Sequence, residues 1–205
     1  MYTAQDVQKL RQVTGAGIMA AKKALEEAKG DLTAAVDILR KQGGKIAASK
    51  MGRATGQGLV ESYIHAGGKI GALVELACET DFVARTEQFK NLAHDLAMQV
   101  AAANPLYLSP AEVPVEIVEH EKQIYLEQLA SAGKTGPMVD KIIEGKLQKH
   151  YAEVCLMRQP FFKDDQKTVA DVLTEAMATI GENIKIKHFA RFELSGKPSV
   201  CSVKD

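Results

Sequence analysis

Few residues in this sequence have the types and spacing that covalent chemistry requires. A hydrolase or acid–base enzyme needs a nucleophile with a base, or two carboxylates that face one pocket. The chain has no G-x-S-x-G, H-E-x-x-H or P-loop motif. Glu79 and Asp81 are close in sequence, yet they equally suit loop or capping positions. The histidines stand singly, at His65, His94, His120, His150 and His188. We therefore predict no catalytic residues and a protein that is not an enzyme.

The cysteines and glycines give no stronger indication of a metal or a cofactor. Cys78, Cys155 and Cys201 are far apart and have no histidine at metal-ligand spacing, so we predict neither a metal site nor a disulfide framework. We expect Cys78 and Cys155 to be buried and Cys201 to be an exposed thiol near a polar terminus. The segment 15–20 has the G-x-G-x-x-A spelling of a dinucleotide-binding turn, but helical spacing precedes it where that fold needs a strand. We predict no cofactor.

The overall charge and hydrophobicity are those of an ordinary globular protein. The 205 residues carry 26 Lys+Arg and 26 Asp+Glu, so the formal net charge is zero, which disfavours a generally basic nucleic-acid coat. No run approaches the roughly 20 apolar residues that a membrane span needs, and the first residues lack a signal-peptide pattern. We expect a cytoplasmic protein that makes no contact with a membrane.

Apolar residues recur at helical spacing three times near the N-terminus. The runs cover residues 3–13 and 18–28, and a third that stops at Gly43-Gly44. These runs predict an N-terminal helical domain over residues 1–44.

Five cationic side chains follow where the chain has no acidic residue: Arg40, Lys41, Lys45, Lys50 and Arg53. Because bound phosphates release counterions, an RNA- or ribosome-binding module that uses residues 40–53 is one candidate function. Aromatic residues that could stack on bases are missing nearby. We prefer to interpret residues 45–57 as a basic linker and expect no direct nucleic-acid binding.

Beyond this segment the apolar spacing changes to the alternation of strands. Two runs predict a hairpin that turns at Gly67-Gly68. A later strand, residues 184–194, alternates apolar residues, including Phe192 and Leu194, with Lys185, Lys187, Arg191 and Glu193 on a wet face. The helices expected between them cover residues 86–103, 167–180 and two segments between 115 and 156 that Gly133 and Pro137 divide. We predict an α+β fold: a core over 58–194 with a small antiparallel sheet, a helical excursion at about 110–160 and a flexible tail over 195–205.

The segment Glu79 to Arg85 lies between the second hairpin strand and the next helix, where a short turn can project side chains. Phe82 is the large apolar residue of this turn. Phenylalanine is usually buried, so the residues alone leave open whether Phe82 belongs to the core or projects from it.

The chain resembles the elongation factor Ts family, and this segment carries the resemblance best. Cys78-Glu79-Thr80-Asp81-Phe82-Val83-Ala84-Arg85 is similar to the family's central signature. The N-terminal positions, similar to its ubiquitin-associated-like domain, are Leu10-Arg11, Thr14-Gly15-Ala16-Gly17, Lys22-Lys23-Ala24-Leu25 and Gly30-Asp31. The C-terminal positions are Gln159-Pro160-Phe161, Gly181-Glu182-Asn183-Ile184 and Arg191-Phe192.

The resemblance implies a guanine nucleotide exchange factor that binds GDP-bound elongation factor Tu and promotes GDP release by disturbing its magnesium and phosphate site. It also implies the contact residues: the turn Thr80, Asp81, Phe82 and Val83, with Phe82 as a wedge, and Ile18, Met19 and Lys22 from the N-terminal domain. Ile18 and Met19 equally suit the core of the helical bundle.

Long members of the family contain a second copy of the hairpin module, whereas here its pattern around Tyr63 to Val74 occurs once. A second chain could replace the missing half. We therefore expect a homodimer with strand 184–194 or the hairpin at its interface.

Overall fold

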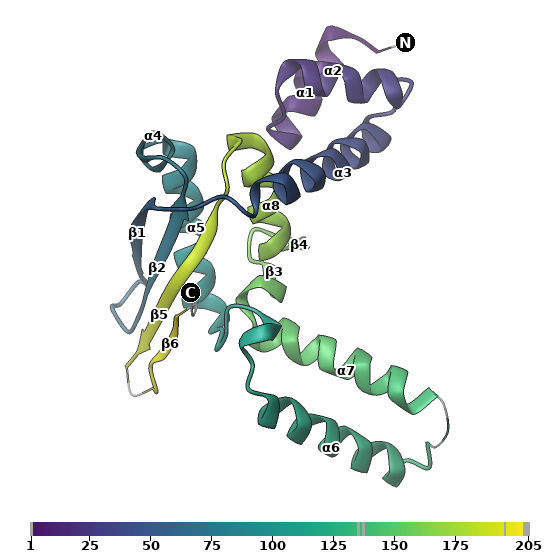
Figure 1. Cartoon of the computed structure of the whole chain (residues 1–205), viewed down its shortest axis with the longest axis vertical. Coiled ribbons are helices and arrows are strands. Elements are labelled where there is room, and N and C mark those ends of the chain that lie inside the picture. The colour runs from purple at the N-terminus through teal and green to yellow at the C-terminus, as the bar shows by residue number, and fades with distance from the viewer. Residues whose placement is uncertain (1, 135, 137, 195, 203–205) are drawn as a thin grey trace. The chain divides into compact units, whose positions relative to one another are not determined.

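The computed structural model describes residues 2–134, 136, 138–194 and 196–202 (Figure 1). The chain forms two compact units, and it passes between them several times. The first unit contains residues Met1–Gly58, Ala77–Phe89 and Asp171–Lys185, and the second contains Leu59–Leu76, Lys90–Ala170 and Ile186–Asp205. Within the described ranges, no helix combines the length and the apolar character that crossing a membrane requires. The mixture of helices with a small antiparallel sheet confirms the predicted α+β class.

The N-terminal helices of the first unit form the predicted bundle. Helix α1 (Ala4–Thr14) begins with a capping box, α2 (Ile18–Glu27) follows a glycine turn, and α3 (Leu32–Lys50) is capped by Asp31. The segment before the glycines is therefore a helix rather than the strand of a dinucleotide-binding fold. A compact apolar cluster joins the three helices: Leu10, Ala21, Ala24, Leu25 and Ala35.

Helix α3 continues through Gly43-Gly44 to Lys50, so the predicted helix end is wrong, and residues 45–50 of the expected linker are helical. Glycine weakens an isolated helix by about 1 kcal/mol relative to alanine. Here a Cβ atom at Gly43 would lie 3.3 Å from the Cβ of Ala178. The missing side chain thus lets α3 pack closely against α8 (Val169–Ile180), and this tertiary packing overrides the local preference.

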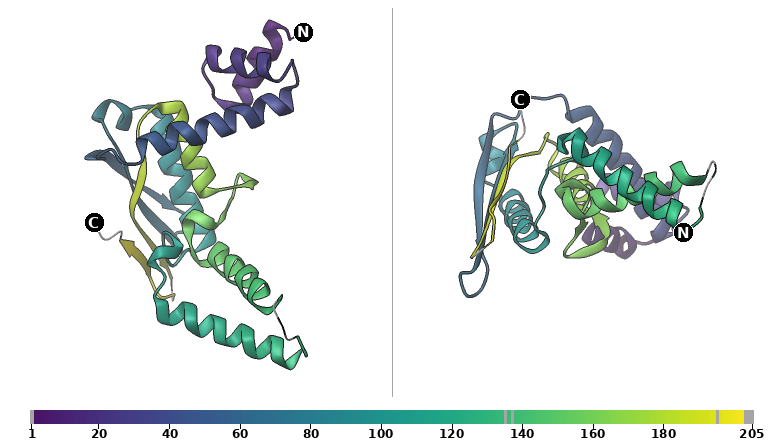
Figure 2. Two further views of the ribbon diagram at one scale, coloured as in Figure 1. Left: turned by 45° about the vertical axis from the view of Figure 1, so that its right-hand side comes forward. Right: turned by 90° about the horizontal axis from the view of Figure 1, so that it is seen from below.

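The second unit is built on a four-stranded sheet with the order β1-β2-β5-β6. Its strands are β1 (Gln57–Ile64), β2 (Ile70–Cys78), β5 (Lys185–Glu193) and β6 (Ser199–Ser202). The hairpin turn at Gly67-Gly68 is confirmed, and both glycines have positive φ angles, 89° and 69°. Helix α5 (Glu87–Ala103) runs along one face of the sheet, and none of the described helices of the second unit covers the other face (Figure 2).

Two expectations about the C-terminal segment are wrong. Residues 199–202 form β6 rather than part of a flexible tail, and β6 pairs antiparallel with β5, with Phe189 opposite Cys201. The pairing turns Cys201 inward, so its thiol is buried rather than exposed. Local composition could not predict this, because the partner strand supplies the hydrogen bonds.

The predicted wet face of β5 is also wrong along its second half. Ile186 is buried as expected, but the next buried residues are Phe189 and Arg191, so the inward-facing positions change from even to odd numbers. Arg191 is 6% exposed and donates from Nε to the carbonyl oxygen of Ala101 at 3.0 Å, whereas Phe192 is 55% exposed. A buried arginine with a backbone acceptor thus replaces the apolar residue expected at this face.

The predicted helical excursion is a helical hairpin of α6 (Val115–Ser131) and α7 (Met138–Val154), joined by buried Leu129, Ile143 and Leu147. Pro137, one of the two expected dividers, lies outside the described residues. A short ribbon of β3 (Pro160–Phe161) and β4 (Asp164–Thr168) follows, so the helix predicted from Lys167 begins instead at Val169. Two 3-10 turns, Pro110–Glu112 and Leu156–Arg158, flank the hairpin.

Candidate functional site

The turn that follows β2 is a single-turn helix, α4 (Asp81–Ala84). Thr80 caps its N-terminus, because the Thr80 hydroxyl accepts a hydrogen bond from the Val83 N–H at 3.4 Å. Asp81 forms an ion pair with Arg85 at 2.8 Å, which spans the turn from its first residue to the residue after its last. Both side chains are substantially exposed, so this pair adds only about 0–1 kcal/mol.

Phe82 projects from this turn. Its exposed fraction is 79%, the highest among the exposed large apolar side chains of the described residues. Ala84 is buried on the other side of α4, so the inward position of this short helix is already occupied. The structure therefore decides between the two readings of Phe82: it is not a core residue. An exposed phenyl group beside a carboxylate is suited to entering an apolar gap in another macromolecule.

A second chain segment holds the start of the turn. The Glu182 carboxylate accepts the Glu79 N–H at 3.0 Å, the Thr80 N–H at 3.1 Å and the Thr80 hydroxyl at 2.7 Å. In the opposite direction, the Glu79 carboxylate accepts the Asn183 N–H at 2.7 Å. We call Glu79, Thr80, Glu182 and Asn183 the double clamp. Sequence reasoning missed it, although Glu182-Asn183 stood within a motif quoted for the family resemblance.

The double clamp is anchored to the end of α3. The Asn183 side-chain amide donates to the carbonyl oxygens of Met51 at 3.2 Å and Arg53 at 2.7 Å, and the Asn183 side chain is buried. Arg53 also pairs with Glu79 at 3.4 Å. The Asn183 N–H, and then Arg53, lower the pKa of the Glu79 carboxyl below its ordinary value of 4.5. This carboxylate is therefore charged at neutral pH, as its acceptor role requires.

Cys78, just before the clamp, is buried as predicted and donates from its thiol to the Thr80 carbonyl oxygen at 3.1 Å. Burial, and then the charge of Glu182, raise the pKa of the Cys78 thiol. Cys155 is also buried as predicted. Both are thus packing residues with little thiolate character.

The N-terminal candidates lie at the start of α2. Ile18 is 57% exposed and Met19 is 75% exposed, and Lys22 is exposed one turn later. The bundle instead buries Ala21, Ala24 and Leu25 from this helix, so the alternative placement of Ile18 and Met19 in the bundle core is wrong. These residues form an apolar surface with an adjacent positive charge. They belong to the same compact unit as Phe82.

The site combines an exposed aromatic side chain with a turn that is held by a segment distant in sequence. Within residues 2–134, 136, 138–194 and 196–202, no group of three or more histidine, cysteine, aspartate or glutamate side chains could hold a metal ion. The geometry is instead that of a docking element: an exposed aromatic side chain on a braced turn. An exposed aromatic side chain on a braced turn is typical of the class of proteins that act by contact with another macromolecule.

Comparison with known proteins specifies this class further. The model of the elongation factor TS family matches residues 3–197. The chain is 53% identical to the elongation factor Ts of Carboxydothermus hydrogenoformans over 194 residues, which cover 95% of this chain and 89% of the relative. It is 53% identical to that of Caldanaerobacter subterraneus over 94% of this chain and 96% of the relative, and 54% identical to that of Geobacter sulfurreducens over 94% and 89%. The chain belongs to the elongation factor Ts family and is a translation elongation factor.

Proposed function

We propose that this protein is a guanine nucleotide exchange factor that binds GDP-bound elongation factor Tu and promotes GDP release. In this proposal the turn of Thr80, Asp81, Phe82 and Val83 presses against the GTPase, and the Phe82 ring disturbs its magnesium and phosphate site. The observation that carries the proposal is the 79% exposure of Phe82 on a turn that is braced at its base. The protein itself makes and breaks no covalent bond, and it acts in the cytoplasm.

The energetics of such an exchange are reciprocal. If this protein weakens the binding of GDP by some free energy, GDP weakens the binding of this protein by the same free energy. Burying a phenylalanine side chain contributes about 1.5–3 kcal/mol. That amount weakens GDP substantially while leaving the complex reversible, as a factor that must be released again requires.

A second contact comes from Ile18, Met19 and Lys22. Exposed apolar residues next to a lysine suit an amphipathic helix of the partner, and the flexible thioether of Met19 can adapt to its groove. We therefore propose that α2 contributes affinity, whereas the turn at Phe82 contributes exchange.

The alternative function, binding of RNA or the ribosome through residues 40–53, receives less support. Arg40 pairs with Asp171 at 3.9 Å and Arg53 pairs with Glu79 at 3.4 Å, so two of the five cations already have acidic partners. An RNA complex that depended on the remaining lysines should weaken steeply between low and moderate salt. A complex with elongation factor Tu that depends on apolar burial should weaken much less.

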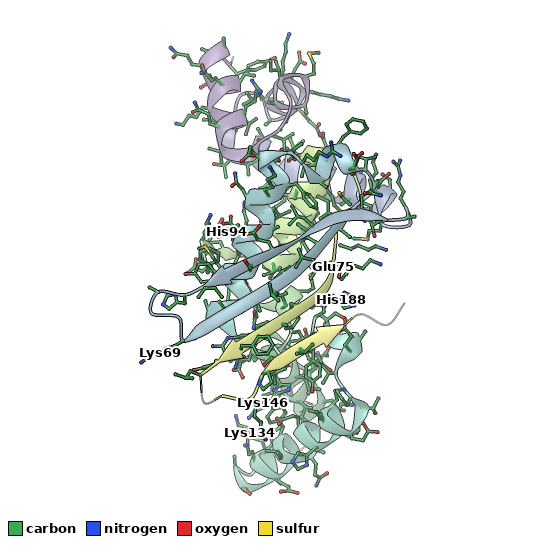
Figure 3. All side chains as sticks on the ribbon, turned by 90° about the vertical axis from the view of Figure 1, so that its left-hand side faces the viewer. Lys69, Glu75, His94, Lys134, Lys146 and His188 are labelled. Atoms are coloured by element: carbon green, nitrogen blue, oxygen red, sulfur yellow. The ribbon has the colours of Figure 1, made fainter. Side chains whose placement is uncertain are left out.

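We also propose a homodimer through the open face of the sheet (Figure 3). Apolar side chains exposed at alternate strand positions gather there: Val60, Ile64, Leu73, Phe192 and Val200. Several of them line a shallow hollow of about 440 Å³. Monomers seldom expose an apolar patch of this kind without a partner, and a second copy offers a matching surface.

The face also carries a hydrogen bond between the His188 Nδ1 atom and the Glu75 carboxylate at 2.6 Å, which gives the patch a polar centre (Figure 3). If the apolar patch pairs two copies, sedimentation should give a mass of twice the 22.2 kDa of one chain at micromolar concentration. Phe192→Glu should reduce the sedimenting mass to that of one chain. A monomeric wild type would overturn the homodimer.

Stopped-flow release of fluorescent GDP from elongation factor Tu tests the proposed function. Wild type should accelerate release, and folded Phe82→Ala should accelerate it far less. Phe162→Ala is the matched control, because Phe162 is another exposed phenylalanine that the proposal leaves without a role. Equal acceleration by wild type and Phe82→Ala would remove Phe82 from the mechanism, and no acceleration by wild type would refute the function.

A further inference from the structure

We propose that Glu182 is the positioning residue of the exchange turn: its carboxylate fixes the direction in which Phe82 points before any partner arrives. This inference rests on the proposed function. Glu182 follows α8 and lies more than one hundred residues from the turn in sequence, yet one carboxylate takes three hydrogen bonds from the base of that turn.

The geometry connects Glu182 to Phe82 through a short relay. One oxygen of Glu182 accepts both the Glu79 and Thr80 N–H groups, and the other accepts the Thr80 hydroxyl at 2.7 Å. With its proton committed to Glu182, the Thr80 hydroxyl oxygen is oriented to accept the Val83 N–H. Thr80 therefore caps α4 in a rotamer that Glu182 selects. Because Phe82 stands two residues after this cap, the cap sets the direction in which its side chain leaves the backbone.

The turn needs such support, since it has little of its own. Helix α4 has four residues, and a helix this short does not hold its shape by its internal hydrogen bonds. Phe82 is too exposed for packing within this chain to fix it. The ion pair between Asp81 and Arg85 is exposed and weak. Hydrogen bonds to a charged carboxylate are about twice as strong as neutral ones, which makes Glu182 the strongest constraint on the turn.

The double clamp has hydrogen bonds in both directions between its two segments, which restrains both segments at once. Glu182 binds the backbone before α4, while Glu79 binds the backbone N–H of Asn183, so each segment holds the other. Asn183 in turn fixes this pair to the end of α3. A turn braced on two sides meets its partner already shaped, and a preorganised element loses less entropy on binding.

The test compares Glu182→Gln in the full chain with wild type and with Glu144→Gln, a control at an exposed carboxylate on α7. Glu182→Gln removes the charge and one of the acceptor oxygens while nearly preserving size. At saturating protein, we expect it to lower the maximal rate of GDP release from elongation factor Tu at least fivefold, with a melting temperature close to that of wild type. Glu144→Gln should match wild type in both measurements.

A local readout separates positioning from general stability. The chain contains five tyrosines but no tryptophan, so Phe82→Trp introduces a single tryptophan at the tip of the turn, which is excited selectively at wavelengths that tyrosine does not absorb. In the free protein, adding Glu182→Gln to Phe82→Trp should increase the fast component of the fluorescence anisotropy decay, whereas adding Glu144→Gln should not. Loss of exchange without this increase would overturn the positioning role, because the loss would then not pass through the turn.

Wild type provides a measurement that does not depend on whether the variant folds. Hydrogen exchange should show the Glu79 and Thr80 amides protected at least tenfold relative to an unstructured peptide, and unprotected amides would overturn the clamp. The outcomes also distinguish the two proposals. A wild type that does not accelerate GDP release refutes the proposed function, whereas an active wild type with an equally active Glu182→Gln refutes only the role of Glu182.

Discussion

The size of the side chain at position 82 should determine how strongly this protein and GDP oppose each other on elongation factor Tu. Full burial of phenylalanine is worth about 1.5–3 kcal/mol. Since 79% of Phe82 is exposed, about four-fifths of that amount, roughly 1.2–2.4 kcal/mol, becomes available when a partner covers the ring. Phe82→Ala should therefore weaken binding to nucleotide-free elongation factor Tu by about 8- to 60-fold.

The assay is a thermodynamic cycle measured by titration calorimetry. Binding is measured with nucleotide-free elongation factor Tu and again with saturating GDP, and the ratio of the two dissociation constants gives the coupling. If the ring enters the space that GDP and magnesium otherwise organise, Phe82→Ala should weaken mainly the nucleotide-free complex and so reduce the coupling. Phe82→Leu, which keeps an apolar but smaller side chain, should give an intermediate value, and Phe162→Ala should leave the coupling unchanged.

One result would refute this reasoning. If Phe82→Ala weakened both complexes by the same factor, Phe82 would contribute affinity alone and would not oppose GDP. The coupling would then have to originate elsewhere, for example at Ile18 and Met19.

Three further predictions concern the folded chain itself. In urea unfolding, Gly44→Ala should stabilise the protein by about 1 kcal/mol, because open space surrounds that position. Gly43→Ala should stabilise it less, because the new Cβ would lie 3.3 Å from the Cβ of Ala178. Equal gains in stability would contradict the close packing of α3. Burial and the adjacent Glu112 raise the pKa of the Cys201 thiol to about 12. Iodoacetamide at about pH 8 should therefore label Cys201 at least about 100-fold more slowly in the native protein than in urea, as followed by mass spectrometry. Rapid labelling of the native protein would contradict the burial of Cys201. The lowered pKa of Glu79 means that its carboxylate adds stability above pH 4.5, and that contribution is lost as the pH falls through the lowered pKa. Glu79→Gln should thus melt below wild type at neutral pH, and the difference should shrink as the pH falls below 4.5; a difference that did not depend on pH would show that the charge of Glu79 is unimportant.

Predictions from sequence were most accurate where one short segment contains the whole cause. The Asp31 cap, the glycines of the β1–β2 turn and the helical spacing of α5 each act within a few residues, so their elements were predicted correctly. The errors share the opposite property. Gly43 lies inside a helix because its lack of a side chain lets α3 pack closely against Ala178. Residues 199–202 form a strand because β5 lies beside them and pairs with them.

By itself, the sequence determined the helical N-terminal bundle, the hairpin, the alternation that makes a small sheet and the motif around Phe82 that resembles a family signature. Only the tertiary structure decided that Phe82 faces outward and that Glu182 holds the base of its turn. The physical reason is range. Capping and periodicity act over one or two turns of chain, whereas exposure and the double clamp depend on which distant segments fill the space around a residue.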